Sequence, residues 1–232
     1  MKALVLLSGC GVFDGSEIHE SVSILICLSK NKIAYDCSSI DKNQLHVINH
    51  RSGIQTKQIR NILDESSRIT RGKIKKLSEI NTSVYSCLII PGGFGVAKNL
   101  SSWAMDEVEC NIDSHFESTI LHFYNQRKPI VSLCISPMIL AKVLKNKASK
   151  LKLTIGSKTE SSEYDIISLQ MKLVQMSVDV KNCSTSQICI DEVNKIISAP
   201  CYMLNASVSE VYDNICMSIK ELKNMLQKNP QS

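Results

Sequence analysis

Cys134 is the residue in this chain whose position is best suited to chemistry. It ends the apolar, strand-length run 130–134, and Pro137 three residues later is favoured at a helix start. A side chain on such a turn points into the crevice at the sheet edge. There the helix dipole and free backbone N–H groups favour a thiolate and can hold a substrate oxyanion. The turn predicts a nucleophile, although composition alone is equally consistent with a buried, inert thiol.

Two further segments place polar groups where they can meet this cysteine. Residues 91–95 form a glycine-rich turn after an apolar strand, which permits close backbone approach to a ligand. Residues 14–20 follow the first strand and carry three acidic side chains. Loops from strand to helix share one edge of a doubly wound sheet, so both segments can face Cys134. Taken separately, the first is only a tight turn and the second only acidic charge at a helix N-terminus.

The elements that position these residues follow from an alternation of short apolar runs with longer stretches of helical period. This alternation predicts an α/β fold, a flavodoxin-like doubly wound sandwich with a mostly parallel sheet and helices on both faces. We expect strands at 3–7, 33–37, 86–90, 130–134, 152–155, 187–190 and 196–199, and helices at 16–28, 111–125, 138–144 and 206–226. The polar, basic segment 55–76 is expected to be an exposed helix and loop that lie over the sheet as an insertion. Residues 1–232 are expected to form a single domain.

Composition excludes several classes of function. The hydrophobic share of 44% and charged share of 21% are typical of a globular protein. No stretch approaches the roughly 18 apolar residues of a membrane span, and the first apolar run is too short for a signal segment. We therefore expect no membrane association and a cytoplasmic location. The net charge is +5, but the basic cluster at 68–76 contains no stacking aromatic residue, so nucleic acid is not an expected partner.

The ten cysteines are expected to be free thiols in a reducing compartment, because a disulfide framework belongs to short secreted chains. Their spacing does not match that of zinc ligands, and we expect no metal and no cofactor. Most of them, including Cys27, Cys37, Cys87 and Cys216, lie in apolar runs and are expected to be buried as small hydrophobic residues. Cys134 is expected to be the thiol that alkylates most readily.

Four motifs give the chain a specific resemblance to a known family. They are SGCGVFDGSEIHE at 8–20, PGGFGVAKNL at 91–100, SLCISPMIL at 132–140 and NKIISAPCYML at 194–204. Together they resemble the ElbB family, associated with enhanced lycopene synthesis and described as glyoxalase-like, in the PfpI superfamily of class I glutamine amidotransferase-like proteins. The resemblance implies a homodimer with Cys134 as nucleophile. By motif position, Glu20 matches the carboxylate that hydrogen-bonds the sulfur, and Gly92 and Gly93 match the oxyanion-hole turn.

The histidines depart from the pattern of the superfamily's best-known enzymes. The five histidines are His19, His46, His50, His115 and His122, so all of them precede Cys134. A class I amidotransferase needs a histidine after the cysteine to activate it. The protease-like members place histidine directly after the cysteine, where this chain has Ile135. We therefore expect neither glutaminase nor protease activity.

Without a histidine base, the coherent arrangement is a thiolate beside a protonated Glu20. Cys134 would add to a small 2-oxoaldehyde such as methylglyoxal, Glu20 would relay the proton of an enediol-like rearrangement, and water would release a hydroxy acid. Gly92, Gly93, Ile135, Glu17 and His19 are the residues expected to bind substrate or its oxyanion. The prediction is a glyoxalase-like enzyme that needs neither glutathione nor a cofactor.

Two alternatives stay open at this point. One is a redox-responsive or chaperone-like protein that uses an exposed Cys134 as an oxidation sensor. The other is an accessory role in isoprenoid metabolism, which only the family's name suggests. Turnover of methylglyoxal would separate the enzyme from both.

Overall fold

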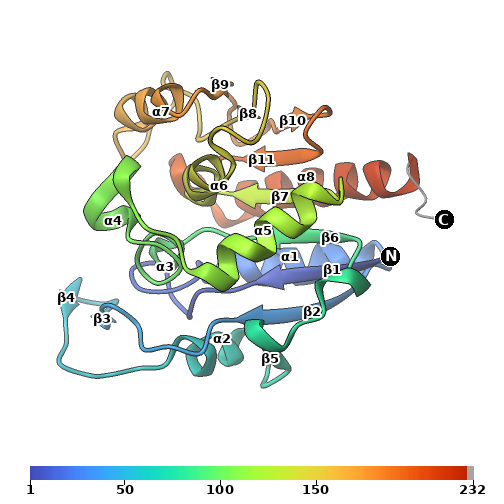
Figure 1. The fold of residues 1–232 in the computed structure, drawn as a ribbon. Coiled ribbons are helices and arrows are strands. Elements are labelled where there is room, and N and C mark those ends of the chain that lie inside the picture. The colour runs from blue at the N-terminus through green and yellow to red at the C-terminus, as the bar shows by residue number, and fades with distance from the viewer. Residues whose placement is uncertain (229–232) are drawn as a thin grey trace.

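A seven-stranded sheet runs through the middle of the molecule (Figure 1). The computed structural model describes residues 1–228, and within them every neighbouring pair in this sheet is parallel except β10 and β11. In spatial order the strands are β10 (Cys189–Asp191), β11 (Ile196–Ala199), β7 (Ile130–Leu133), β6 (Cys87–Ile90), β1 (Lys2–Leu6), β2 (Ala34–Ser39) and β5 (Ile74–Lys76). The chain adds β2 and β5 on one side of β1 and the later strands on the other side, so the strand order changes direction between β1 and β6. The predicted doubly wound α/β fold is confirmed.

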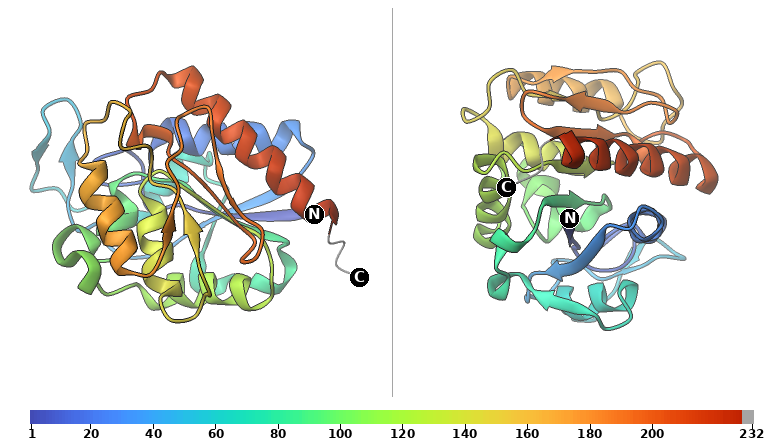
Figure 2. Two further views of the ribbon diagram at one scale, coloured as in Figure 1. Left: turned by 90° about the horizontal axis from the view of Figure 1, so that it is seen from above. Right: turned by 90° about the vertical axis from the view of Figure 1, so that its right-hand side faces the viewer.

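Helices cover both faces of the sheet. Figure 2 shows α1 and α8 side by side on one face and α5 and α6 on the other. The helices are α1 (Ile18–Lys30), α2 (Ile62–Ile69), α3 (Phe94–Lys98), α4 (Trp103–Asp106), α5 (Ser114–Asn125), α6 (Ser136–Leu144), α7 (Ile166–Gln175) and α8 (Val208–Lys228), with 3₁₀ turns η1 (Leu77–Glu79), η2 (Thr82–Val84), η3 (Glu107–Glu109) and η4 (Cys201–Met203). No helix within residues 1–228 is both long and apolar enough to cross a membrane.

The central strands are continuous apolar runs because both of their faces are covered. The side chains of β6 and β7 are fully buried, as are those of β1 beyond its first residue. Such runs are typical of parallel strands between two helical layers. Local signals place the helix starts: the carboxylate of Asp113 accepts hydrogen bonds from the N–H groups of His115 and Phe116, which sets the first turn of α5.

Two segments differ from the sequence-based expectation. The helix expected within residues 55–76 is present as α2, but the segment is not an insertion over the sheet, since β5 follows the helix and pairs in parallel with β2 at the sheet edge. The predicted strand 152–155 forms only as β8 (Lys152–Leu153), which pairs with β9 (Asp179–Val180) outside the main sheet. A second small pair, β3 (Ile48–Asn49) and β4 (Ile54–Gln55), is a hairpin. Short runs of this kind lack the periodicity that would distinguish them by sequence.

The expectation that all ten cysteines are free is wrong for two of them. Cys27 on α1 and Cys216 on α8 form a disulfide, with their Cα atoms 5.6 Å apart. The two helices pack side by side, so residues 189 positions apart in sequence face each other. Sequence spacing cannot reveal a pair that only tertiary packing brings together. Cys37 and Cys87 are free and buried, as expected.

Candidate active site

The candidate site lies at the carboxyl ends of the central strands, next to the place where the strand order changes direction. Loops after β1, β6 and β7 meet there, and they carry Glu20, Gly92 and Cys134 respectively. A Cβ built onto Gly92 would lie 2.7 Å from the Cys134 sulfur and 2.9 Å from Oε2 of Glu20. The structure therefore brings together the three segments that the sequence singled out. This is the position where doubly wound sheets bind ligands.

Cys134 sits on a strained turn between β7 and α6. Its φ of +56° lies in the left-handed region, which non-glycine residues adopt rarely and mostly where function or tight packing requires it. Ser136 secures the turn through hydrogen bonds from its hydroxyl to the carbonyls of Leu133 (2.8 Å) and Ile90 (3.1 Å). Pro137 then occupies the first turn of α6. The local sequence thus holds the sulfur at the sheet edge in one orientation.

The surroundings of the sulfur correct the expectation of an exposed thiol with a lowered pKa. Cys134 is only 6% exposed, whereas Cys10 is the free cysteine within residues 1–228 that is not buried. Burial raises the pKa of the Cys134 thiol well above its ordinary value, and the charge of Glu20 raises it further. The backbone N–H groups of Gly93 and Ile135 act in the opposite direction. Desolvation outweighs the helix N-terminus here.

Glu20 is a completely buried carboxyl group in the first turn of α1. Its Oε2 accepts a hydrogen bond from the N–H of Gly92 (2.8 Å), while Oε1 is buried without a hydrogen-bond partner. Burial raises the pKa of Glu20 to about 8, and the nearby charge of Glu17 adds to this effect. A group with this pKa is about nine-tenths protonated at pH 7. The raised pKa favours the protonated carboxyl group expected beside Cys134, but the raised pKa of Cys134 does not favour the thiolate expected with it.

The Glu20–Cys134 pair is suited to moving a proton. An ionised Glu20 can take the thiol proton, and a protonated Glu20 can give a proton to a group bound beside the sulfur. Its pKa lies close to physiological pH, where a general acid or base is most effective. Proton transfer at this site therefore needs no histidine. Within residues 1–228 no group of three or more histidine, cysteine or acidic residues is arranged to hold a metal ion.

The two glycines of the turn after β6 have different roles. The N–H of Gly92 is engaged by Glu20, so Gly92 positions the carboxyl group rather than an oxyanion, which corrects the sequence-based expectation. The N–H of Gly93 is directed at the sulfur together with that of Ile135. Gly93 has a φ of +95°, and a Cβ there would lie 2.3 Å from the Gly15 carbonyl oxygen. Glycine is required at both positions for close approach.

Glu17 and His19 are the two residues of the acidic segment that were expected to bind substrate beside Glu20. Glu17 contacts Glu20, and His19 contacts Tyr202. Glu17 caps α1 by accepting a hydrogen bond from the N–H of Glu20 (2.6 Å), and it lines the cavity described below. His19 is half exposed and is not among the cavity-lining residues. Its Nδ1 is 2.8 Å from the hydroxyl of Tyr202, which does line the cavity. His19 therefore reaches the cavity through Tyr202 and through Glu17, whose Oε1 lies 3.8 Å from the same Nδ1.

A cavity of about 430 Å³ opens in front of Cys134. Its walls come from α3, α4, the α6 turn, α7 and η4, and most of its lining is apolar or aromatic. Sequence reasoning missed Phe94, Trp103, Tyr164 and Leu169 because it assigned no helix to the segments that carry α3, α4 and α7, and it gave Tyr202 no role although this residue lies in the motif at 194–204. The available signal was the density of large apolar side chains in 94–104 and 164–174.

Comparisons with known proteins agree with this architecture. No family model matches the chain. The ES1 protein homolog, mitochondrial, of Rattus norvegicus is 34% identical over 98% of this chain and 85% of its own length. The human glutamine amidotransferase-like class 1 domain-containing protein 3, mitochondrial, is 32% identical over 98% of this chain and 84% of its own length.

A solved structure is also similar to this chain in sequence and in fold. The crystal structure of an isoprenoid biosynthesis protein with an amidotransferase-like domain from Ehrlichia chaffeensis superposes with a TM-score of 0.88. That protein is 35% identical and covers 97% of this chain and 99% of its own. The superfamily expected from the motifs is confirmed, while membership of the ElbB family itself stays a prediction. The cytoplasmic location also stays a prediction, and the two curated relatives carry the word mitochondrial in their names.

Proposed function

The chain belongs to the ES1 family of glutamine amidotransferase-like class 1 proteins, and from the geometry of its site we propose that it is a glyoxalase-like enzyme. It converts small 2-oxoaldehydes such as methylglyoxal to 2-hydroxy acids without glutathione. The observation that supports this reaction is a buried carboxyl group with a pKa near 8, held against a cysteine sulfur at the floor of a cavity. The resemblance to the glyoxalase-like ElbB family adds to this support.

The proposed reaction uses Cys134 to form a bond and Glu20 to move protons. The sulfur adds to the aldehyde carbon, and Glu20 passes the thiol proton to the carbonyl oxygen, giving a hemithioacetal. The Glu20 carboxylate then removes the remaining proton from that carbon and returns it to the neighbouring carbon. The hydroxyl proton crosses to the other oxygen, and a thioester forms. Water hydrolyses the thioester and restores the thiol. One substrate carbon is oxidised while its neighbour is reduced, so the electrons balance within the substrate.

Hydrogen-bond donors lie at the position where negative charge develops during this reaction. The N–H groups of Gly93 and Ile135 face the sulfur, so they are positioned for an oxygen on the carbon bonded to it. Glu17 and Tyr202 line the adjacent wall. The unpartnered Oε1 of Glu20 is the polar atom left for a proton transfer to substrate.

The same geometry favours an enzyme over an oxidation sensor. A sensor needs an exposed thiol with a low pKa, because the thiolate is the form that oxidants attack. Cys134 is buried and its pKa is raised. A general acid or base beside the sulfur has a use in turnover but none in simple oxidation.

The test is a steady-state assay with methylglyoxal in the absence of glutathione, with lactate measured as product. Cys134→Ser should abolish lactate formation, and Glu20→Gln should lower kcat by about 10²–10⁴-fold, the usual effect of losing a general acid or base. Cys10→Ser and Glu160→Gln are matched controls, because both residues lie outside the cavity lining. Lactate formation at the wild-type rate in Glu20→Gln would rule out the proton transfer.

The pH profile provides a second readout. The base in the rate-limiting proton transfer is the ionised form of Glu20, so kcat/KM should rise with pH and level off above a pKa of about 8. In Glu20→Gln the residual activity should lack this rise. A wild-type profile that is flat between pH 6 and pH 9 would assign proton transfer to another group.

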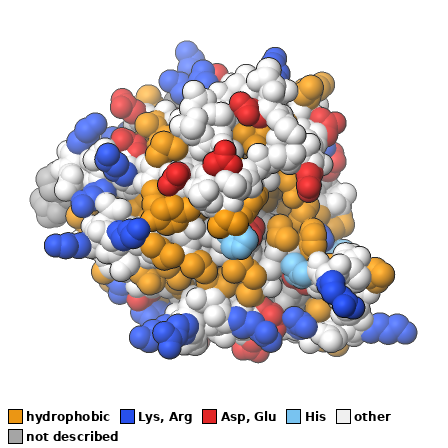
Figure 3. Space-filling view, turned by 180° about the vertical axis from the view of Figure 1, so that it is seen from behind, with side chains coloured by type: hydrophobic (Ala, Val, Ile, Leu, Met, Phe, Trp, Pro, Cys, Tyr) orange, Lys and Arg blue, Asp and Glu red, His pale blue; other side chains and the backbone are white. Residues whose placement is uncertain are grey.

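Self-association is the second part of the proposal. Ile18, Val22 and Ile26 repeat every four residues along α1 and are exposed by 43%, 38% and 41%. Figure 3 shows hydrophobic side chains gathered across the face seen from behind, beside two histidines. A helix stripe of this kind is covered in a homodimer. Sedimentation analysis should give a dimer, and Val22→Glu should shift it toward the monomer.

A further inference from the structure

The cavity in front of Cys134 is larger than a three-carbon substrate requires. A volume of about 430 Å³ lies in the range of sites that enclose drug-sized organic molecules. Methylglyoxal has only five non-hydrogen atoms, so most of the cavity would stay filled with water during its turnover. An apolar wall in contact with trapped water is unfavourable compared with the same wall in contact with apolar atoms. The size and lining therefore indicate a bulkier substrate.

Several charged groups around the cavity already have partners within the protein itself. Lys172 on α7 and Glu107 after α4 form an ion pair of 2.7 Å. The Lys98 ammonium donates to the carbonyl of Phe13 (2.9 Å), and Asp165 accepts from the backbone N–H of Ser168 (2.9 Å). These groups are satisfied without a ligand, so they do not call for a polar partner. Glu20 is completely buried beside the sulfur and does not itself line the cavity, and its Oε1 has no hydrogen-bond partner.

The apolar walls of the cavity come from separate elements. Trp103 lies on α4 and Leu169 on α7, and Phe94 on α3 packs edge-on against Tyr164, with ring centroids 6.1 Å apart. The ion pair between Lys172 and Glu107 links α7 to the end of α4 across this region. The cavity thus combines a reactive cysteine with apolar, partly aromatic walls, which the ion pair borders.

We infer that the natural substrates are 2-oxoaldehydes whose second substituent is an aromatic ring or a branched aliphatic chain, seated against Trp103 and Leu169. This inference rests on the proposed function for its chemistry, and it adds the substrate class. The aldehyde lies at Cys134, and the apolar substituent displaces water from the α4 and α7 walls. Replacing a methyl by a phenyl group buries enough additional apolar area to favour the larger compound roughly 10- to 50-fold in kcat/KM.

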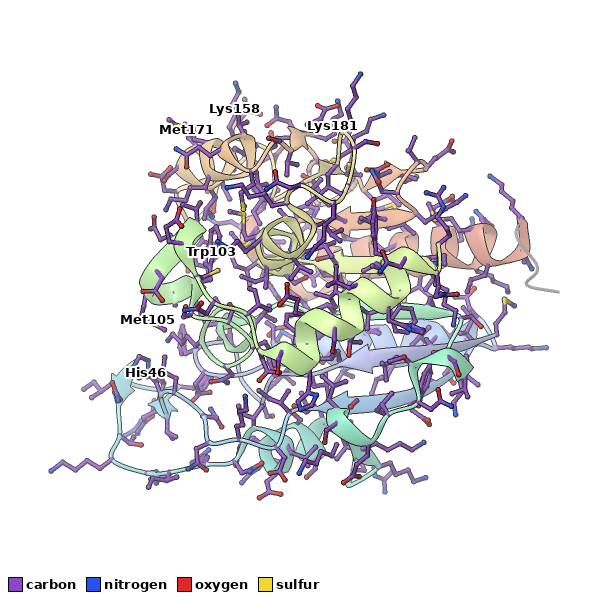
Figure 4. The ribbon with its side chains drawn as sticks, viewed as in Figure 1. His46, Trp103, Met105, Lys158, Met171 and Lys181 are labelled. Atoms are coloured by element: carbon purple, nitrogen blue, oxygen red, sulfur yellow. A yellow bond between two sulfur atoms is a disulfide. The ribbon has the colours of Figure 1, made fainter. Side chains whose placement is uncertain are left out.

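The first experiment compares phenylglyoxal with methylglyoxal in matched variants of α7. Leu169→Gln places a polar group in the apolar wall, whereas Met171→Gln makes a similar change two residues away. Met171 is 61% exposed and does not line the cavity (Figure 4). The ratio of kcat/KM for phenylglyoxal over methylglyoxal should fall about tenfold in Leu169→Gln and stay unchanged in Met171→Gln. Because the ratio is compared between variants, differences in intrinsic aldehyde reactivity cancel.

The second experiment does not need turnover. Trp103 is the one tryptophan of the sequence and lies in the cavity wall, so its fluorescence reports on ligand contact. In Cys134→Ser, mandelate, the product expected from phenylglyoxal, should quench this fluorescence with a Kd at least tenfold lower than lactate. Leu169→Gln should weaken mandelate binding, and Met171→Gln should not.

The outcomes separate the two proposals. If both aldehydes are turned over but their ratio is the same in Leu169→Gln as in the wild type, the substrate class is wrong and the glyoxalase reaction stands. If neither aldehyde is turned over, the reaction is wrong, and tighter binding of mandelate than of lactate would still support an apolar ligand in this cavity. Equal binding of mandelate and lactate would overturn the inference.

Discussion

The raised pKa of Glu20 predicts a dependence of stability on pH that one substitution should remove. The native chain holds this proton with a pKa of about 8, against an ordinary value of 4.5 when the carboxyl is solvated. The native state therefore binds the proton more tightly than the unfolded chain does. The resulting stabilisation is complete below pH 4.5 and is lost as the pH rises toward 8, because the unfolded chain ionises freely while the buried carboxyl resists ionisation.

The magnitude follows from these two pKa values. At pH 5 the group has lost about 1 kcal/mol of its low-pH contribution to the free energy of unfolding, and at pH 8.5 it has lost nearly 5 kcal/mol. The change between the two pH values is about 4 kcal/mol. Glu20→Gln has no proton to lose in this range, so its stability lacks this component. Relative to the wild type, Glu20→Gln should therefore gain about 4 kcal/mol between pH 5 and pH 8.5.

Urea denaturation of both proteins at the two pH values measures this difference directly. Titrating groups that do not interact with Glu20 contribute equally to both chains and cancel in the comparison. Glu160→Gln, a change at an exposed glutamate, is the control and should follow the wild type at both pH values. If the stability difference between wild type and Glu20→Gln changes by less than about 1 kcal/mol, the carboxyl is not buried as a proton-holding group, and the proton-transfer mechanism loses its basis.

Three further outcomes are expected from the packing of the site and of its cysteines. Gly92→Ala should lower the free energy of unfolding by at least about 2 kcal/mol and abolish turnover, because the added methyl group would lie 2.3 Å from Cβ of Cys134. A urea midpoint equal to that of the wild type would contradict this. Reduction of the disulfide, or the double change Cys27→Ser with Cys216→Ser, should cost about 2–5 kcal/mol and lower Tm by roughly 5–15 °C, as measured by calorimetry with and without reductant. Limiting iodoacetamide should label Cys10 before Cys134 in peptide mass spectra, since burial and the charge of Glu20 raise the pKa of the Cys134 thiol well above its ordinary value and keep it protonated; the opposite order would contradict this raised pKa.

The sheet and the nucleophile could be predicted because their signals are local. Continuous apolar runs mark β1, β6 and β7, whose side chains are buried from both faces. Pro137 and the preceding apolar run indicate the turn at Cys134 without any knowledge of distant residues. The glycine-rich turn and the acidic segment follow their strands directly. A doubly wound topology then requires these loops to meet at one edge.

The chemistry of the site could not be predicted in the same way, because it depends on desolvation and on contacts between segments. The sequence predicted a lowered thiol pKa from the helix N-terminus, but the burial of Cys134 outweighs that effect. The role of the Gly92 N–H changed once Glu20 was found to accept its hydrogen bond. The spacing of residues in the sequence reveals neither the exposure of a group nor its hydrogen-bond partner.

By itself, then, the sequence determined the order of the elements. It also placed Cys134, Glu20 and the glycine turn in segments that follow strands at one edge of the sheet, since local periodicity and chain direction are sufficient to predict this placement. Only the tertiary structure decided three other features: the disulfide between α1 and α8, the high pKa of Glu20, and the apolar cavity built from α3, α4 and α7. Each of these depends on which surfaces pack together and on how completely water is excluded between them.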